Sequence, residues 1–295
     1  MTGNSADRHA QLDLSFARRG DRTVLDRRRF RWPFVLTRTF ALDSCPRHML
    51  TVIVQTSSGA LHGEDRLSQW FEVGENAAAH ITTQGASAVH RASGGLESRD
   101  SARLSVAQGG FLEYLPEPRI LFPGAALEQT LEIECAPGGT ALVCDAFTIH
   151  DIGCGGCGFR RFRSATILRC GGDPVLVDRM DIDGLIAGKS AAFRAFASLV
   201  VAAPGWSAAV APLADELSAS LASLPGLYGA ASLLPAEAGM GVRLAGRELR
   251  NVRAGTATIW FGVRSALYGA PPDSRRKGDD PASILDGAPN DLHRS

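Results

Sequence analysis

The sequence has almost no net charge, because 31 Lys and Arg residues balance 31 Asp and Glu residues. A neutral molecule does not attract a polyanion over its whole surface, so we do not expect nucleic acid as a partner. Residues 1–16 contain no apolar run, so we expect no secretory signal. The six cysteines lie mostly between apolar neighbours. This usage is typical of buried thiols in a reducing cytoplasm, where we expect the protein to act.

Several motifs that would indicate catalysis are also missing. No Gly-rich loop ends in Gly-Lys-Ser/Thr, so we do not expect the chain itself to hydrolyse nucleotides. The sequence contains no nucleophile elbow, no His-Glu-x-x-His pair and no four-ligand Cys/His spacing typical of zinc, and its seven histidines are scattered. These absences favour a protein that is not an enzyme and that binds no cofactor tightly.

One uncharged stretch, residues 195–214, is long enough to span a bilayer. Pro204, Gly205 and Pro212 interrupt it. We therefore predict no membrane span, and instead a strand over 196–202, a turn, and a second short strand over 206–211.

Most of the sequence between residues 12 and 210 shows patterns that are typical of β-strands. Turn residues recur every 8–15 positions, and the Gly-rich segment 170–174 predicts a hairpin. Strand-like runs occupy 50–56, 101–106, 131–135, 141–149 and 164–170. The sequence therefore predicts a mainly β fold, a large multi-stranded structure of antiparallel or β-helical-like sheets, with no evident internal repeat.

Two segments near the C-terminal end change to a helical period. In 212–226, Leu213, Leu217 and Leu221 fall on one face. In 246–269, apolar residues recur at threes and fours. The opposite side of this second helix carries Arg247, Arg250, Arg253 and Arg264. We therefore predict two α-helices in this region.

Three regions follow from these patterns. We predict a flexible N-terminus over 1–11 and a single β-rich domain over 12–270. The remaining residues, 271–295, are polar, and we predict a disordered tail there.

Polar residues in two Gly-containing segments are candidates for a functional site. Asp65 follows a flexible segment, where it either faces a polar cavity or closes a charged turn. Thr82, Thr83 and Ser87 either line a hydrated passage or lie on a solvated strand edge.

Two carboxylates, Asp145 and Asp178, interrupt apolar strands. An ionised carboxylate is costly to bury, so each needs a partner, a metal ion or water. Either these residues lie on the solvated face of a strand, or together with Asp65 they line an internal route along which oxygen ligands pass a divalent ion.

A third candidate combines His150 with the CxxC pair Cys154 and Cys157. Imidazole and thiolate suit nickel or zinc, although two or three ligands do not close a structural zinc site. The alternatives are plain turn residues and a redox pair, and the glycines between the thiols disfavour the helix N-terminus that a redox pair needs.

The order of these motifs resembles the urease accessory protein UreD family, called UreH in some organisms, from about residue 12 to 270. The resemblance rests on several segments in the expected order: RRGDRTVL, SSGALHGEDRL, HITTQGASAVHRA, FLEYLPEPRILFPGA, FRSATILRCGGDPVLVDRMDI and the final helix that follows VRLAG.

The resemblance implies a non-catalytic cytoplasmic scaffold that helps to mature urease. Members of the family bind apo-urease and the accessory protein UreF, which recruits the GTPase UreG, so GTP would enter only through UreG. Nickel would be a transient cargo that passes through the protein. Asp65, Ser87, Asp145 and Asp178 fall where the polar interior residues of the family lie. Weak oxygen ligands suit such a conduit, because a tight site would trap the ion.

The sequence departs from the family pattern after residue 149, where the family has Gly-Arg-x-Ala-x-Gly-Glu. Here Cys154 replaces the Arg and Phe159 replaces the Glu. One alternative function is therefore a β-rich metal-dependent hydrolase that uses His150, Cys154, Cys157 and Asp145. Another is a polyanion-binding module that uses the Arg-rich segment 18–32.

Overall fold

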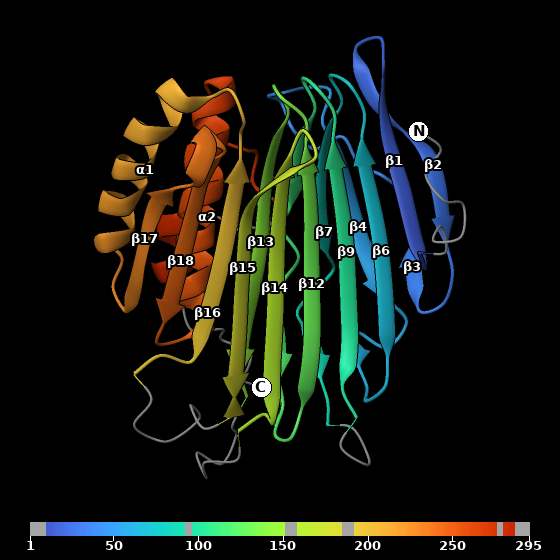
Figure 1. Cartoon of the computed structure of the whole chain (residues 1–295), viewed down its shortest axis with the longest axis vertical. Helices are drawn as coiled ribbons and strands as arrows, with labels where there is room; N and C mark the ends of the chain where they lie inside the picture. Colours follow the sequence, from blue (N-terminus) through green and yellow to red (C-terminus); the bar gives the residue numbers. More distant parts are fainter. Residues whose placement is uncertain (1–9, 92–95, 151–157, 185–191, 276–279, 287–295) are drawn as a thin grey trace, which may run out of the picture.

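A computed structural model describes residues 10–91, 96–150, 158–184, 192–275 and 280–286. Two β-sheets pack face to face, and helices cover part of the outer face of the larger sheet (Figure 1). The 7-stranded sheet has the order β15-β14-β12-β9-β6-β1-β2, and the main path of the 11-stranded sheet is β17-β18-β16-β13-β10-β7-β4-β3. The predicted mainly β fold is confirmed.

The centre of the described fold is a stack of four coils. In each coil the chain passes along the 11-stranded sheet first and then through one strand of the 7-stranded sheet. The pairs are β4 (Leu50–Thr56) with β6 (Arg66–Val73), β7 (Ala78–Thr83) with β9 (Ser98–Val106), β10 (Phe111–Tyr114) with β12 (Ala126–Cys135), and β13 (Thr140–Ile149) with β14 (Arg161–Cys170). Successive coils are hydrogen-bonded in parallel in both sheets.

The β-helical-like prediction is therefore confirmed, whereas the prediction of antiparallel pairing is wrong for the coils. Alternation of apolar and polar residues shows which face of a strand is buried, but it does not show the direction of the neighbouring strand. The coils also mean that the chain does repeat structurally, although no repeat is evident in the sequence.

Antiparallel strands extend the two sheets at the ends of the stack. They are β1 (Leu12–Arg19), which pairs in parallel with β6 but antiparallel with β2 (Arg22–Phe30), then β3 (Phe34–Leu36), β15 (Asp173–Asp183), β16 (Ala195–Ala202), β17 (Leu227–Leu233) and β18 (Gly239–Gly246). The predicted hairpin at 170–174 joins β14 to β15.

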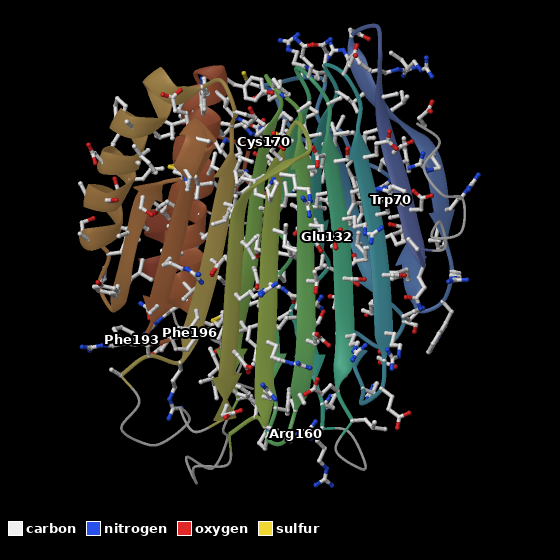
Figure 2. All side chains as sticks on the ribbon, viewed as in Figure 1. Trp70, Glu132, Arg160, Cys170, Phe193 and Phe196 are labelled. Atoms are coloured by element: carbon white, nitrogen blue, oxygen red, sulfur yellow. The ribbon has the colours of Figure 1, made fainter. Side chains whose placement is uncertain are left out.

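The main core lies between the two sheets, where apolar residues from inward positions of both sheets meet. Phe147 of β13 and Phe162 of β14 are buried there, with ring centroids 4.5 Å apart. Outward positions of the smaller sheet carry polar side chains. Glu132 of β12, for example, pairs with Arg103 of β9 at 3.1 Å on the face shown in Figure 2. The strands are therefore amphipathic in the way that their period predicts.

Two helices, α1 (Ser207–Ala222) and α2 (Leu249–Tyr268), pack on the outer face of the 11-stranded sheet, beside β16, β17 and β18 (Figure 1). Two short helices are also present. The 3₁₀-helix η4 (Pro235–Glu237) lies between β17 and β18, and α3 (Pro281–Asp286) follows α2 and contacts it. Among the helices that the structure describes, none combines the length and apolar character that a membrane span requires. Both predicted α-helices are present.

The prediction of a short strand over 206–211 is wrong, because α1 already begins at Ser207. Val210 is buried together with Leu213, Leu217 and Leu221, so the helical stripe extends one turn further back than the leucines alone indicate. Alanine has the strongest helix propensity, and the alanines in this segment support the longer helix.

Arg264 of α2 is the main correction to the helix prediction. It is not on the polar side of the helix but completely buried. Its guanidinium donates to Glu113 Oε1 and Oε2 at 2.8 and 2.7 Å, and to Asp43 Oδ1 at 2.8 Å. The contacts join α2 to β10 and to the segment after β3, so we call Arg264, Glu113 and Asp43 the buried charge clamp.

The clamp keeps Glu113 ionised. Burial alone would raise the pKa of Glu113, but the hydrogen bond with His80 and the charge of Arg264 outweigh it and lower this pKa to about 2. His80 Nδ1 lies 2.6 Å from Glu113 Oε2. Each charge of the clamp thus depends on its partners, because an unpaired charge in this position would have no solvent around it.

We expect the substitution Arg264→Leu to lower the free energy of unfolding by about 3–5 kcal/mol, because it leaves the buried Glu113 without its cation and Asp43 with Arg275 alone. The matched control is Arg250→Leu on the same helix, where an exposed ion pair with Glu248 is lost. The control should change stability by no more than about 0.5–1 kcal/mol. Urea unfolding followed by circular dichroism measures both values, and equal losses would contradict the clamp.

Candidate functional site

Three neighbouring parallel strands of the 11-stranded sheet are interrupted at the same level. Beyond the interruptions the strands resume as β5 (Ala60–Leu61), β8 (Ser87–Val89) and β11 (Arg119–Leu121), which again pair in parallel. β13 continues past this level and pairs with both β10 and β11. We call the segments 57–59, 84–86 and 115–118 together the strand break.

Side-chain hydroxyls replace part of the hydrogen bonding that the strand break removes. Thr82 Oγ1 donates to the carbonyl of Leu115 at 2.8 Å. Thr83 Oγ1 accepts the N–H of Glu117 at 2.9 Å and donates to the carbonyl of Gly85 at 3.1 Å. Pro116 and Pro118 have no N–H, so they add no donor that needs a partner. In the strand break, side-chain hydroxyls thus form hydrogen bonds with backbone N–H and C=O groups that have no partner strand.

A cavity of about 450 Å³ lies on the outer side of the strand break, next to α2, and we call it the outer cavity. Its lining includes Thr82, Thr83 and Glu117, together with Trp260 of α2. Trp260 Nε1 and Thr51 Oγ1, which are buried in the same lining, have no hydrogen-bond partner among the described residues. The outer cavity therefore combines apolar walls with unused polar groups.

A second cavity, of about 200 Å³, lies on the inner side, and we call it the inner cavity. Core residues of both sheets line it, among them Val54 and Leu67, and so does Ser87. The outer and inner cavities share the lining residues Gln55, Thr83, Gln84 and Pro116. Because the shared residues belong to the strand break or adjoin it, the two cavities lie on opposite sides of the strand break and are separated there by these residues.

Beyond the inner cavity, polar side chains occupy positions between the two sheets. Asp100, Gln129 and Ser164 are register partners on the adjacent strands β9, β12 and β14. Asp145 of β13 faces them, and Ser164 Oγ donates to Asp145 Oδ2 at 2.6 Å. A void of about 10 Å³, roughly the room that one water needs, is lined by Asp100, Gln129 and Asp145.

A cation and an amide complete this group. Arg119 pairs with Asp100, and Gln69 Nε2 donates to Asp100 Oδ1 at 3.0 Å. Arg119 also lines the inner cavity, so the group is continuous with it. We call Gln69, Asp100, Arg119, Gln129, Asp145 and Ser164 the interior polar cluster.

The interior polar cluster contains two carboxylates and one guanidinium. Burial raises the pKa of Asp145, and hydrogen bonds with Ser164 and Gln129 only partly offset this effect. Burial also raises the pKa of the neighbouring Tyr114. In the described part of the chain, no three His, Cys, Asp or Glu side chains are grouped so as to hold a metal ion. The cluster can offer a passing cation carboxylate, amide and hydroxyl oxygens in small number.

Four of the six residues predicted to line a polar route contact these cavities. Thr82 and Thr83 line the outer cavity, Thr83 and Ser87 line the inner cavity, and Asp145 belongs to the interior polar cluster. The alternative that places the threonines on a solvated strand edge is wrong, because β7 pairs with β4 on one side and β10 on the other.

The structure places Asp65 and Asp178 outside the cavities described above. Asp65 closes a turn, since its Oδ2 accepts the N–H of His62 at 2.8 Å. Asp178 lies on the edge strand β15, where its Oδ1 pairs with Arg243 at 2.5 Å. Asp65 thus lies in the turn that the sequence left open as an alternative. Asp178 instead lies opposite the buried Thr166 of β14 and pairs with a residue of β18 in the other sheet, so it is not on the solvated outer face of β15.

Of the predicted metal ligands His150, Cys154 and Cys157, the structure describes only His150. His150 is half-buried, and the centroid of its ring lies 4.2 Å from that of Phe122. Cys154 and Cys157 lie outside the described residues. Metal binding by these three residues therefore stays a prediction.

Sequence reasoning missed most of the interior polar cluster. Asp100 lies on the same face of its strand as Ala102 and Leu104. Gln129 likewise lies on the same face as Leu127 and Leu131. Each therefore occupies an inward position of an amphipathic strand. A polar residue in phase with the apolar face of a strand is the pattern that could have identified them. Arg119 carries no such pattern, because it follows the strand break.

We expect Asp145→Asn to stabilise the protein at pH 8 by about 1.4 kcal/mol for each unit by which folding raises the pKa of Asp145. The folded carboxyl binds its proton more tightly than the unfolded one, so wild-type stability falls as pH rises between the two pKa values. The gain should therefore shrink at pH values below the unfolded pKa of an aspartate.

Urea unfolding of the wild type and the variant across this pH range measures the effect. Asp178→Asn is the matched control, and we expect it to change stability little, because a partly exposed ion pair contributes little. A destabilising effect of Asp145→Asn at pH 8 would show that the ionised carboxylate is well stabilised and would contradict the electrostatic account.

Comparison with known proteins identifies the family of this chain. A family model described as UreD urease accessory protein matches residues 8–278. The urease accessory protein UreD 2 of Bradyrhizobium sp. strain BTAi1 is 49% identical over 271 residues, covering 90% of this chain and 93% of the relative. UreD 2 of Bradyrhizobium sp. strain ORS 278 is 48% identical over 261 residues, covering 88% and 91%. UreD 1 of Methylorubrum populi is 34% identical over 277 residues, covering 92% of each chain. The chain therefore belongs to the UreD family of urease accessory proteins.

Proposed function

We propose that this protein is a non-catalytic scaffold for urease maturation and that nickel crosses it through the strand break. The observation that supports the proposal is that the outer and inner cavities share lining residues at the strand break, and that the inner cavity is continuous with the interior polar cluster. In the proposal the strand break, with Thr82 and Thr83, forms an opening through the 11-stranded sheet. The proposed route runs from the outer cavity through the inner cavity to Asp100 and Asp145. Membership of an accessory-protein family supports a role in preparing urease rather than catalysis by this chain.

The chemistry of the lining suits transit rather than storage. Hydroxyl and amide oxygens bind a divalent cation weakly, and a conduit needs sites that the ion can leave. The two carboxylates of the interior polar cluster provide negative charge midway, and Arg119 offsets part of it. A cation that arrives beside Asp145 favours its ionised form, so proton and cation compete for the same carboxylate.

The partners follow from the family rather than from a surface of this chain. In our proposal the scaffold binds apo-urease and the accessory proteins UreF and UreG in the cytoplasm. Nickel is a transient cargo, no cofactor is bound tightly, and GTP acts only through UreG. Nucleic acid and membrane have no part in the proposal.

The metal-dependent hydrolase has no support from the comparisons, because the family that matches is one of accessory proteins. The residues assigned to it are also not assembled in the described part of the chain. The His150 ring contacts that of Phe122 in a tilted arrangement, whereas Asp145 accepts a hydrogen bond from Ser164 between the sheets.

The proposal is tested by producing urease together with all of its accessory proteins, with and without this chain, and by measuring nickel per urease active site. We expect nickel-loaded, active urease only when the chain is present. Equal nickel content without the chain would overturn the proposed function.

A bulky residue in the opening should block transit without removing the scaffold. Ala86 lines the inner cavity between Thr83 and Ser87, so Ala86→Phe fills space that the route needs. We expect the nickel content of urease to fall at least several-fold while the variant still co-purifies with its partners. The measurement is metal analysis of the isolated urease.

The control for this prediction is Ala230→Phe, which adds the same ring at an exposed position of β17, away from the described cavities. It should leave the nickel content unchanged. Fully loaded urease in the presence of the Ala86→Phe variant would show that nickel does not pass through the strand break.

A further inference from the structure

Four residues with rings stand in one row just beyond the strand break. The buried residues Leu61, Val89, Leu121 and Ile149 are register partners on β5, β8, β11 and β13. The residues that follow them are His62, His90, Phe122 and His150. The row therefore arises because the coils stack in register, and its members are 28, 32 and 28 residues apart in the sequence.

The rings of this row contact one another in order. The rings of His62 and His90 are stacked with centroids 5.2 Å apart and planes only 10° apart. Phe122 follows with centroids 4.7 Å from His90 and 4.2 Å from His150. Three of the five histidines that the structure describes thus stand together, although all seven are scattered in the sequence.

The backbone holds the row in place, and its end is open to solvent. The N–H of His90 donates to the carbonyl of Leu61 at 2.9 Å, and that of Phe122 donates to Val89 at 3.1 Å. His62 is exposed and His90 is half-buried. Both imidazoles are therefore accessible to an ion from solution, whereas Phe122 separates them from His150.

We propose that His62 and His90 together bind a divalent transition-metal ion such as Ni²⁺, with water as the remaining ligands. Imidazole is a preferred ligand of Ni²⁺, Cu²⁺ and Zn²⁺ but not of the hard cation Mg²⁺. Metal–imidazole bonds are about 2.0–2.1 Å long, so the two ligating nitrogens can lie at most about 4.2 Å apart. The lone pairs of the imidazole nitrogens lie in the ring planes, which are almost parallel here, so the His62 ring must rotate for both nitrogens to point at one ion. The exposed position of His62 allows this rotation.

The surroundings favour a cation at this position. Asp65 accepts the backbone N–H of His62, which places a carboxylate next to the pair. The same strands border the strand break, and Ser87 of the inner cavity precedes His90 by only three residues, or about 10 Å of extended chain. Where nickel is the cargo, the pair is an uptake site beside the opening, and only this last step rests on the proposed function.

Titration of the full-length chain with Ni²⁺ tests the site. We expect His62→Ala and His90→Ala each to weaken Ni²⁺ binding by about tenfold or more, because each removes one of two protein ligands. The control His48→Ala removes a half-buried histidine elsewhere and should leave the affinity unchanged. An excess of Mg²⁺ should not compete. Isothermal titration gives the affinity, and paramagnetic broadening by Ni²⁺ identifies the histidine rings that bind it.

A variant that adds a ligand tests the site in the opposite direction. Phe122→His adds an imidazole between His90 and His150, so it should tighten Ni²⁺ binding and broaden the signals of all four rings. Unchanged affinity in His62→Ala and His90→Ala, or an equal loss in His48→Ala, would overturn the proposal.

The failure of this site and the failure of the proposed function are distinguishable. If Ni²⁺ binds to the pair but urease acquires nickel normally without the chain, the metal site is supported and the proposed role in urease maturation is contradicted. If urease needs the chain to acquire nickel but neither alanine variant changes the Ni²⁺ affinity, the proposed role is supported and the metal site is contradicted.

Discussion

A strand that is interrupted inside a sheet leaves backbone N–H and C=O groups without ladder partners, and a buried group of this kind must be paired by other means. In this protein three adjacent parallel strands are interrupted at one level, and the hydroxyls of Thr82 and Thr83 take part of the missing bonds. Pro116 and Pro118 have no backbone N–H, so two fewer donors need a hydrogen-bond partner. β13 continues past the same level and holds the coils in register. Both cavities depend on this arrangement, because the lining residues that they share belong to the strand break or adjoin it.

The buried charge clamp acts next to this interruption. Glu113 is the residue before Tyr114, where β10 ends, and Arg264 ties it to α2. The outer cavity lies between the strand break and α2, so the position of the helix sets its width. Stability and site geometry are therefore coupled through one ion pair. Loss of Arg264 should disturb the wall of the outer cavity as well as the free energy of unfolding.

Local patterns predicted the elements better than their arrangement. Period-two alternation indicated the strands, and the helical period indicated α1 and α2, because both report which face of an element is buried. The same patterns do not report strand direction, so the prediction left antiparallel and β-helical-like sheets open together, and the antiparallel part is wrong for the coils. They also placed Arg264 on a solvated face, since its partners Glu113 and Asp43 are more than 150 residues away in the sequence.

The candidate site was predictable in part for a similar reason. Asp145 stands out because it interrupts an apolar run, and the Thr82–Thr83 pair stands out because hydroxyls are adjacent there. The imidazole row could not be predicted, because it exists only once the coils are in register. We propose that a cation passes the interior carboxylates on its way to urease. The most direct test replaces both Asp100 and Asp145 by asparagine and measures nickel per active site in urease matured with that chain. We expect nickel-poor urease from complexes that still assemble, and fully loaded urease would contradict the proposed route.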